Sequence, residues 1–185
     1  MEEKRLFDIL KLYIAKYPSQ EVALAKKESG SWKKYSIQKY IEITNNISYA
    51  LIKLGIKKDD KVGIICNNRP EWNMLDMAIM QVGAITVPIY PTISKEDYHY
   101  IINDCEVKLI VLEGQSVLQK IESVKDESPS LTGIYTIGTK SDYPTFDQLV
   151  EIGKSNPDPE ELKKREDNVD EKDCATIIYT SGTTG

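Results

Sequence analysis

The chain has 185 residues, of which 41% are apolar and 29% are charged, and its formal net charge is −5. This composition is typical of a soluble globular protein. The acidic balance and the lack of a basic stripe disfavour nucleic acid as a partner, because a phosphate backbone needs clustered Lys and Arg. We see no secretion signal and no apolar run of about 18 residues, so we expect a cytoplasmic protein without a transmembrane segment.

The first third of the chain predicts a helix, a hairpin and a longer helix. Apolar residues recur at helical spacing over residues 4–17. Residues 18–36 place two strand-like stretches around Gly30, which predicts a β-hairpin. Ser36 is the candidate N-cap of an amphipathic helix that should end at Gly55.

From residue 61 onward, short apolar runs alternate with amphipathic segments. The predicted strands are residues 61–66, 85–89, 108–112, 133–137 and 175–180. The predicted helices between them are 70–82, which Pro70 opens, a helix that follows the capping pair Ser94 and Asp97, 116–124 and 146–153. Parallel neighbours need crossover connections, so we expect an α/β fold with a mostly parallel sheet and helices on both faces. Pro88 lacks an N–H, so its strand should lie at an edge or end there. Residues 153–173 are charged and should form a surface connection.

The cysteines and the histidine do not predict a reactive or metal-binding centre. Cys66, Cys105 and Cys174 are widely spaced and lie in or beside apolar runs, so buried free thiols are favoured over catalysis. His99 is the only histidine, and no close Cys/His cluster indicates a zinc site.

The last apolar run leads directly into hydroxyl and glycine residues, "TSGTTG". Ligands bind outside the carboxyl ends of parallel strands, and converging N–H and O–H donors there suit phosphate. A flexible linker is the alternative, but the string follows a strand directly, which favours phosphate binding. The string is not a Walker loop, because no lysine follows the glycines in the required pattern. The candidate phosphate contacts are Thr180, Ser181, Gly182, Thr183, Thr184 and Gly185.

The stretch "YTSGTTG" resembles the phosphate loop of the adenylate-forming superfamily, which includes acyl-CoA synthetases, luciferases and the adenylation domains of peptide synthetases. A second stretch, "NNRPEWNMLDMAIMQVGAITVPIYPT", is similar to a segment of long-chain fatty acyl-CoA synthetases. The resemblance covers essentially all of residues 1–185 but only about the first third of the family. It implies the first subdomain of the family's large α/β domain.

The resemblance implies an ATP-dependent ligase that forms an acyl-adenylate from a fatty acid and then transfers the acyl group to coenzyme A. The six residues from Thr180 to Gly185 would then hold the phosphates of ATP. The proline, lysine and glycine that continue the loop, the Mg²⁺ ligand and the catalytic residues would lie beyond Gly185. We therefore expect a fragment, truncated within the phosphate loop, that is inactive alone and that self-associates through exposed apolar surface.

Several alternatives stay open at this stage. The parent could be an acyl-AMP ligase, a synthetase for short or aromatic acids, or a non-catalytic α/β binding module. Peripheral membrane contact is also open. Turn and cap roles are favoured for Asn67 and Asn68, and a core position for Trp72. The turn at Tyr90–Thr92 fits a path to an acyl site and a rigid turn equally well.

Overall fold

A four-stranded parallel sheet forms the centre of the computed structural model, which describes residues 5–180. Its strands are β3 (Lys61–Ile65), β4 (Ile85–Pro88), β5 (Val107–Leu112) and β6 (Gly133–Thr136), in the spatial order β4-β3-β5-β6. All three pairings are parallel. The strands are almost continuously apolar because both faces of the sheet are covered. The predicted α/β architecture is confirmed.

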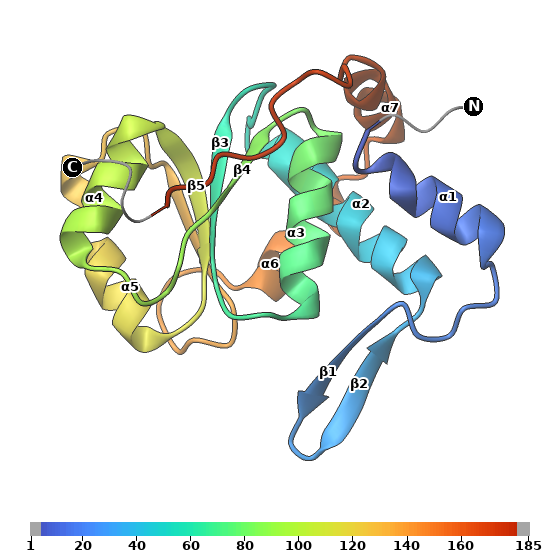
Figure 1. Ribbon diagram of the computed structural model, residues 1–185, viewed down its shortest axis with the longest axis horizontal. Coiled ribbons are helices and arrows are strands. Elements are labelled where there is room, and N and C mark those ends of the chain that lie inside the picture. Colours follow the sequence, from blue (N-terminus) through green and yellow to red (C-terminus); the bar gives the residue numbers. More distant parts are fainter. Residues whose placement is uncertain (1–4, 181–185) are drawn as a thin grey trace.

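Helices cover the sheet on two sides and create two separate cores. They are α1 (Asp8–Lys16), α2 (Ile37–Lys53), α3 (Pro70–Gln81), α4 (Lys95–Asp104), α5 (Gln115–Glu122), the short 3-10 helix η1 (Lys125–Glu127), α6 (Phe146–Ser155) and α7 (Pro159–Asp167). Because side chains alternate along a strand, Val62 and Ile64 enter the core with α2, α3 and α6, whereas Ile65 and Ile110 enter the core with α4 and α5. Figure 1 shows these two groups of helices on opposite sides of the strands.

The helices begin at the caps that the sequence predicts. Ser36 caps α2, and its Oγ accepts a hydrogen bond from Lys39 N at 3.2 Å. Ser94 and Asp97 form a reciprocal capping box at α4. Pro70 occupies the first turn of α3, where its missing N–H costs nothing.

Residues 175–180, here called the strap, run beside β4 with a single parallel bridge between Thr86 and Thr176. The Thr86 N–H donates to the carbonyl of Ala175 at 3.1 Å, and the Thr86 carbonyl accepts from Ile177 N at 3.0 Å. The next donor along that edge of β4 would be Pro88, which has no N–H, so the ladder ends there. The predicted fifth strand is therefore shortened to one bridge, and Pro88 faces the outer edge, as its chemistry requires.

A two-stranded hairpin stands apart from the main sheet. β1 (Leu24–Glu28) and β2 (Ser31–Tyr35) pair antiparallel, with Lys27 opposite Trp32. The turn residues Ser29 and Gly30 have φ of 49° and 85°, the two positive values that a two-residue turn of type I′ needs. Figure 1 shows the hairpin projecting from the body of the molecule.

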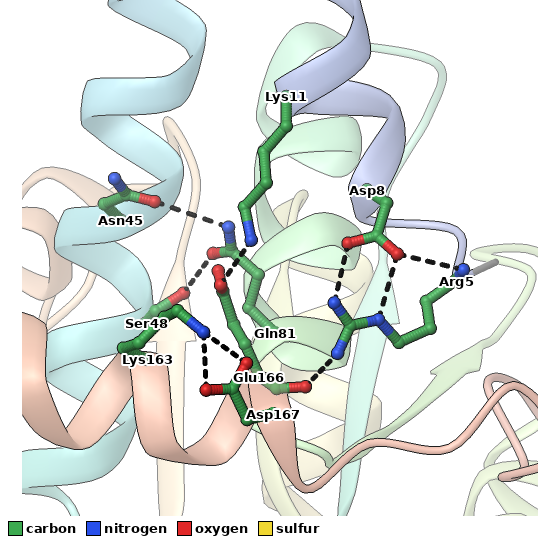
Figure 2. Close-up of polar contacts among 9 residues, drawn as sticks. All are labelled: Arg5, Asp8, Lys11, Asn45, Ser48, Gln81, Lys163, Glu166 and Asp167. Atoms are coloured by element: carbon green, nitrogen blue, oxygen red, sulfur yellow. Dashed lines mark hydrogen bonds and ion pairs between the residues drawn. The ribbon is translucent and has the colours of Figure 1, made fainter. Parts of the chain in front are cut away.

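The charged stretch at residues 153–173 holds α7, a helix that packs against the body of the fold. Leu162 on this helix is buried in the core beside α2, and Glu166 is also buried. Lys11 on α1 donates to Glu166 at 2.6 Å, and the Arg5 guanidinium donates to the Glu166 backbone carbonyl (Figure 2). The expectation of a surface connection thus missed a helix, because only two of its positions turn inward.

Helices α2 and α6 approach one another closely at Gly153. A Cβ built at Gly153 would lie 1.6 Å from the backbone oxygen of Asn46, well inside any van der Waals contact. Only glycine fits here, and the close approach lets α2 and α6 pack against one another. Both helices contribute to the core that Val62, Leu109 and Tyr135 enter.

Candidate functional site at the carboxyl edge of the sheet

The loops that follow β3 and β4, together with Ile178, line an open pocket of about 660 Å³ at the carboxyl edge of the sheet. In open parallel sheets this edge is where ligands bind. The pocket joins residues that lie far apart in the sequence: Cys66, Asn67, Asn68, Trp72, Tyr90 and Ile178. The sequence predicts turn, cap or core roles for Asn67, Asn68 and Trp72, and the structure brings them together in one pocket.

The pocket walls are mostly apolar and contain no activated thiol. Trp72 is half-buried, Tyr90 is 70% exposed, and Ile178 comes from the strap. Burial raises the pKa of Cys66 to about 12, so its thiol stays protonated at neutral pH. Cys105 is buried, as the sequence predicts, but Cys174 is exposed at the edge of the fold, contrary to expectation.

A charged cluster holds the β3–α3 loop in place next to this pocket. The Glu71 side chain accepts from Arg69 Nε at 3.0 Å and from Lys26 Nζ on the hairpin at 2.7 Å. Arg69 also donates to Glu113 at the end of β5, and Glu113 in turn accepts from the backbone N–H of Asn67 at 3.1 Å. The cluster thereby joins the hairpin, the β3–α3 loop and the end of β5 at one edge of the sheet.

Glu71 is the centre of this cluster, with only 6% of its surface exposed. Burial alone would raise the pKa of Glu71, but the hydrogen bonds from Arg69 and Lys26 outweigh it and lower the pKa to about 2. Glu71 is therefore a carboxylate at neutral pH and acts as an acceptor that positions its neighbours. The sequence does not predict this cluster, because its one local signal is the Arg-Pro-Glu stretch at the start of α3.

Hydrogen bonds and a ring contact hold the strap against the fold as far as Tyr179. The strap pairs with β4 through the bridge at Thr176. Further along the strap, the Tyr179 hydroxyl donates to Asp104 Oδ2 at 2.6 Å, and the Tyr179 ring stands edge-on to the Tyr100 ring with centroids 6.1 Å apart. Burial and the bond to Asp104 both raise the pKa of Tyr179, so the hydroxyl remains a donor. Alternate strap residues thus face α4 or the carboxyl-edge pocket.

Of the predicted phosphate contacts, Thr180 is the one that the structure describes, and its side chain is exposed at the end of the strap. Ser181, Gly182, Thr183, Thr184 and Gly185 lie outside the described residues. Within residues 5–180, no group of three His, Cys, Asp or Glu side chains is arranged to hold a metal ion. Over that same range, no helix has the length and apolar character needed to cross a membrane.

The sequence profile of AMP-binding enzymes matches residues 11–185, which is nearly the whole chain. The chain belongs to the AMP-binding enzyme family. The resemblance seen in the "YTSGTTG" stretch is confirmed at the level of the family.

Two relatives of this AMP-binding chain are named long-chain-fatty-acid–CoA ligases. A long-chain-fatty-acid–CoA ligase of Xenopus laevis is 38% identical over 169 residues, which is 89% of this chain and 23% of the relative. A long-chain-fatty-acid–CoA ligase of Mycobacterium bovis is 39% identical over 147 residues, which is 78% of this chain and 24% of the relative. The chain thus spans about a quarter of the length of the curated relatives it matches.

A solved structure shares the fold described above. The luciferase-like enzyme from the mealworm Zophobas morio superposes with a TM-score of 0.79 at 20% identity, covering 100% of this chain and 41% of that one. At this identity the likeness shows the architecture alone. The two-sided α/β sheet is therefore the fold of this AMP-binding chain as well as of its structural neighbour.

Proposed function

We propose that this chain is the first α/β subdomain of an AMP-forming long-chain fatty acyl-CoA ligase. The supporting observation is that the strap, which leads directly into the Ser-Gly-Thr-Thr-Gly string, is fastened along the carboxyl edge beside a pocket with apolar walls. The substrate class comes from the names of the relatives, which are long-chain ligases.

In this proposal ATP is held through its phosphates by Thr180, Ser181, Gly182, Thr183, Thr184 and Gly185. The residue types fit that task, because uncharged hydroxyls and backbone N–H groups at a glycine-rich turn are donors that suit phosphate oxygens. Thr180 is exposed at the end of the fastened strap, so its hydroxyl is accessible to a ligand. Mg²⁺ would arrive with the nucleotide, and none of the described residues is proposed as its ligand.

The reaction would join a fatty acid carboxylate to the α-phosphorus of ATP, with release of pyrophosphate. The thiol of coenzyme A would then displace AMP from the acyl-adenylate. The carboxyl-edge pocket suits an apolar substrate, because Trp72 and Ile178 present apolar surface to it. Glu71 and Arg69 would serve this site indirectly by holding the β3–α3 loop that carries Asn67.

The chain alone would supply only part of such a site. We expect residues 1–185 on their own to lack turnover, to bind nucleotide weakly, and to self-associate through exposed apolar side chains such as Leu6, Ile9 and Tyr90. A cytoplasmic location and peripheral contact with membranes belong to the same proposal.

The test is fatty-acid-dependent exchange between labelled pyrophosphate and ATP, catalysed by the intact protein that carries this chain. Exchange that rises with a long-chain acid supports adenylate formation with that substrate class. Exchange that responds only to short or aromatic acids would move the protein to another branch of the family. A complete lack of exchange with every acid would favour a binding module that has lost the chemistry.

A further inference from the structure

The β1–β2 hairpin has one face that nothing in the described chain covers. The antiparallel register places Ala25, Lys27, Trp32 and Lys34 on this face, which we call the outer hairpin face. All four side chains are exposed, and Trp32 is 62% exposed. Within residues 5–180, no ion pair or side-chain hydrogen bond involves Lys27 or Lys34. A large aromatic ring thus lies beside two free ammonium groups.

The opposite face of the hairpin is fixed to the body of the fold. Tyr35 is buried, and Lys26 pairs with the buried Glu71 at 2.7 Å. Lys33 lies over the Tyr35 ring, 5.6 Å from its centroid. These contacts fix the backbone of the hairpin against the fold, so the outer hairpin face is already oriented outward before it meets a flat surface.

The hairpin also differs in charge from the rest of the protein. Residues 24–35 contain four lysines and one glutamate, a net charge of +3, in a chain whose net charge is −5. The glutamate, Glu28, lies on the opposite face, where it approaches Lys26 at 3.6 Å. The charged residues of the outer hairpin face are therefore all cationic. The hairpin that carries this face projects from the body of the molecule (Figure 1).

We propose that the outer hairpin face docks the protein on anionic lipid bilayers, with Trp32 in the interfacial layer and Lys27 and Lys34 on the headgroups. Tryptophan favours the membrane–water interface, and each lysine near an anionic leaflet strengthens binding. A nucleic acid would need a wider basic surface, because its affinity grows with the number of phosphates contacted. The inference deepens the peripheral contact proposed above, and it does not depend on the chemistry at the carboxyl edge.

The experiment is co-sedimentation of the intact protein with vesicles of equal parts phosphatidylcholine and phosphatidylserine, at low and high salt. We expect salt-sensitive binding that vesicles of phosphatidylcholine alone do not show. The double variant Lys27→Gln/Lys34→Gln should lower the partition coefficient roughly 25-fold, at about fivefold per lysine. Trp32→Ala should lower it severalfold even at low salt. Circular dichroism checks that each variant is folded.

Matched controls keep the result specific to this face. Lys53→Gln/Lys172→Gln makes the same charge change at two other exposed lysines and should leave binding within about twofold. Ile9→Ala removes a 53% exposed apolar side chain from α1 and should have little effect. Loss of binding in the Ile9 variant but not in the Trp32 variant would overturn the proposal. The proposal would also be overturned if the protein bound heparin and this binding were lost in the Lys27/Lys34 variant but kept in the Trp32 variant. Pyrophosphate exchange is measured separately without vesicles, so that a failure of membrane binding can be told apart from a failure of the proposed ligase activity.

Discussion

Replacing Glu71 by Gln removes the carboxylate that Arg69 and Lys26 share at the edge of the sheet. The native contacts lower the pKa of Glu71 from 4.5 to about 2, and each pKa unit corresponds to about 1.4 kcal/mol. The carboxylate therefore contributes about 3 kcal/mol to the free energy of unfolding at neutral pH. Because the native pKa is lowered, this stability is present above the unfolded value of 4.5 and is lost as the pH falls toward 2.

Urea unfolding followed by circular dichroism measures both effects. We expect Glu71→Gln to lower the free energy of unfolding near neutral pH by about 3 kcal/mol, since two cations lose their buried partner. Between about pH 4.5 and pH 3 the wild-type protein should lose about 2 kcal/mol that the variant does not lose. Glu151→Gln removes an exposed carboxylate 3.5 Å from Lys154 and serves as the control, with an expected change under about 1 kcal/mol. Equal stability and equal pH dependence of the Glu71 variant and the wild type would refute the role given to this cluster.

Three further outcomes are expected. Thr183→Val in the intact protein should slow adenylate formation about tenfold or more, because a lost hydrogen bond to a charged group costs roughly 1.5–3 kcal/mol; an unchanged exchange rate would mean that Thr183 does not touch phosphate. Gly153→Ala should destabilise the fold by about 3 kcal/mol or more, because the new Cβ would overlap the Asn46 carbonyl. The control is Gly133→Ala, whose Cβ would meet only atoms at 3.5 Å or beyond, and this variant should unfold within a few degrees of the wild type in a thermal melt. Residues 1–185 alone should bind Mg-ATP no tighter than about millimolar, since ordering the terminal loop costs roughly 1–2 kcal/mol per residue, and micromolar binding in a calorimetric titration would rule out a divided nucleotide site.

The fold was predictable because its local signals agree with one another. The apolar runs at β3 and β5 are long enough to identify buried strands, and the Ser36 and Ser94 caps mark where helices begin. Helix α7 was missed because its inward face consists of Leu162 and Glu166 alone, so its pattern looks like that of a solvated segment. Contacts between residues that are distant in sequence hold it, such as that of Glu166 with Lys11, 155 residues apart.

The candidate site was only partly predictable, for a similar reason. The hydroxyl and glycine string after the strap is a local motif, so the sequence shows it directly. The cluster that fixes the neighbouring loop joins Lys26 to Glu71 across 45 residues and Arg69 to Glu113 across 44. No periodicity or spacing indicates such pairs, because they form only when the hairpin and two strands meet at one edge. The pocket beside Trp72 and Ile178 likewise exists only once the strap lies along β4.

The central claim, that this chain belongs to an AMP-forming acyl-CoA ligase, is tested most directly by the products of the intact protein. Purified protein is incubated with ATP, Mg²⁺, a long-chain fatty acid and coenzyme A, and the nucleotides and phosphates are identified by phosphorus NMR. We expect one AMP and one pyrophosphate for each acyl-CoA formed, with no product when the fatty acid is left out. Formation of ADP and inorganic phosphate would contradict the account, because it would mean cleavage at the γ-phosphate and no acyl-adenylate.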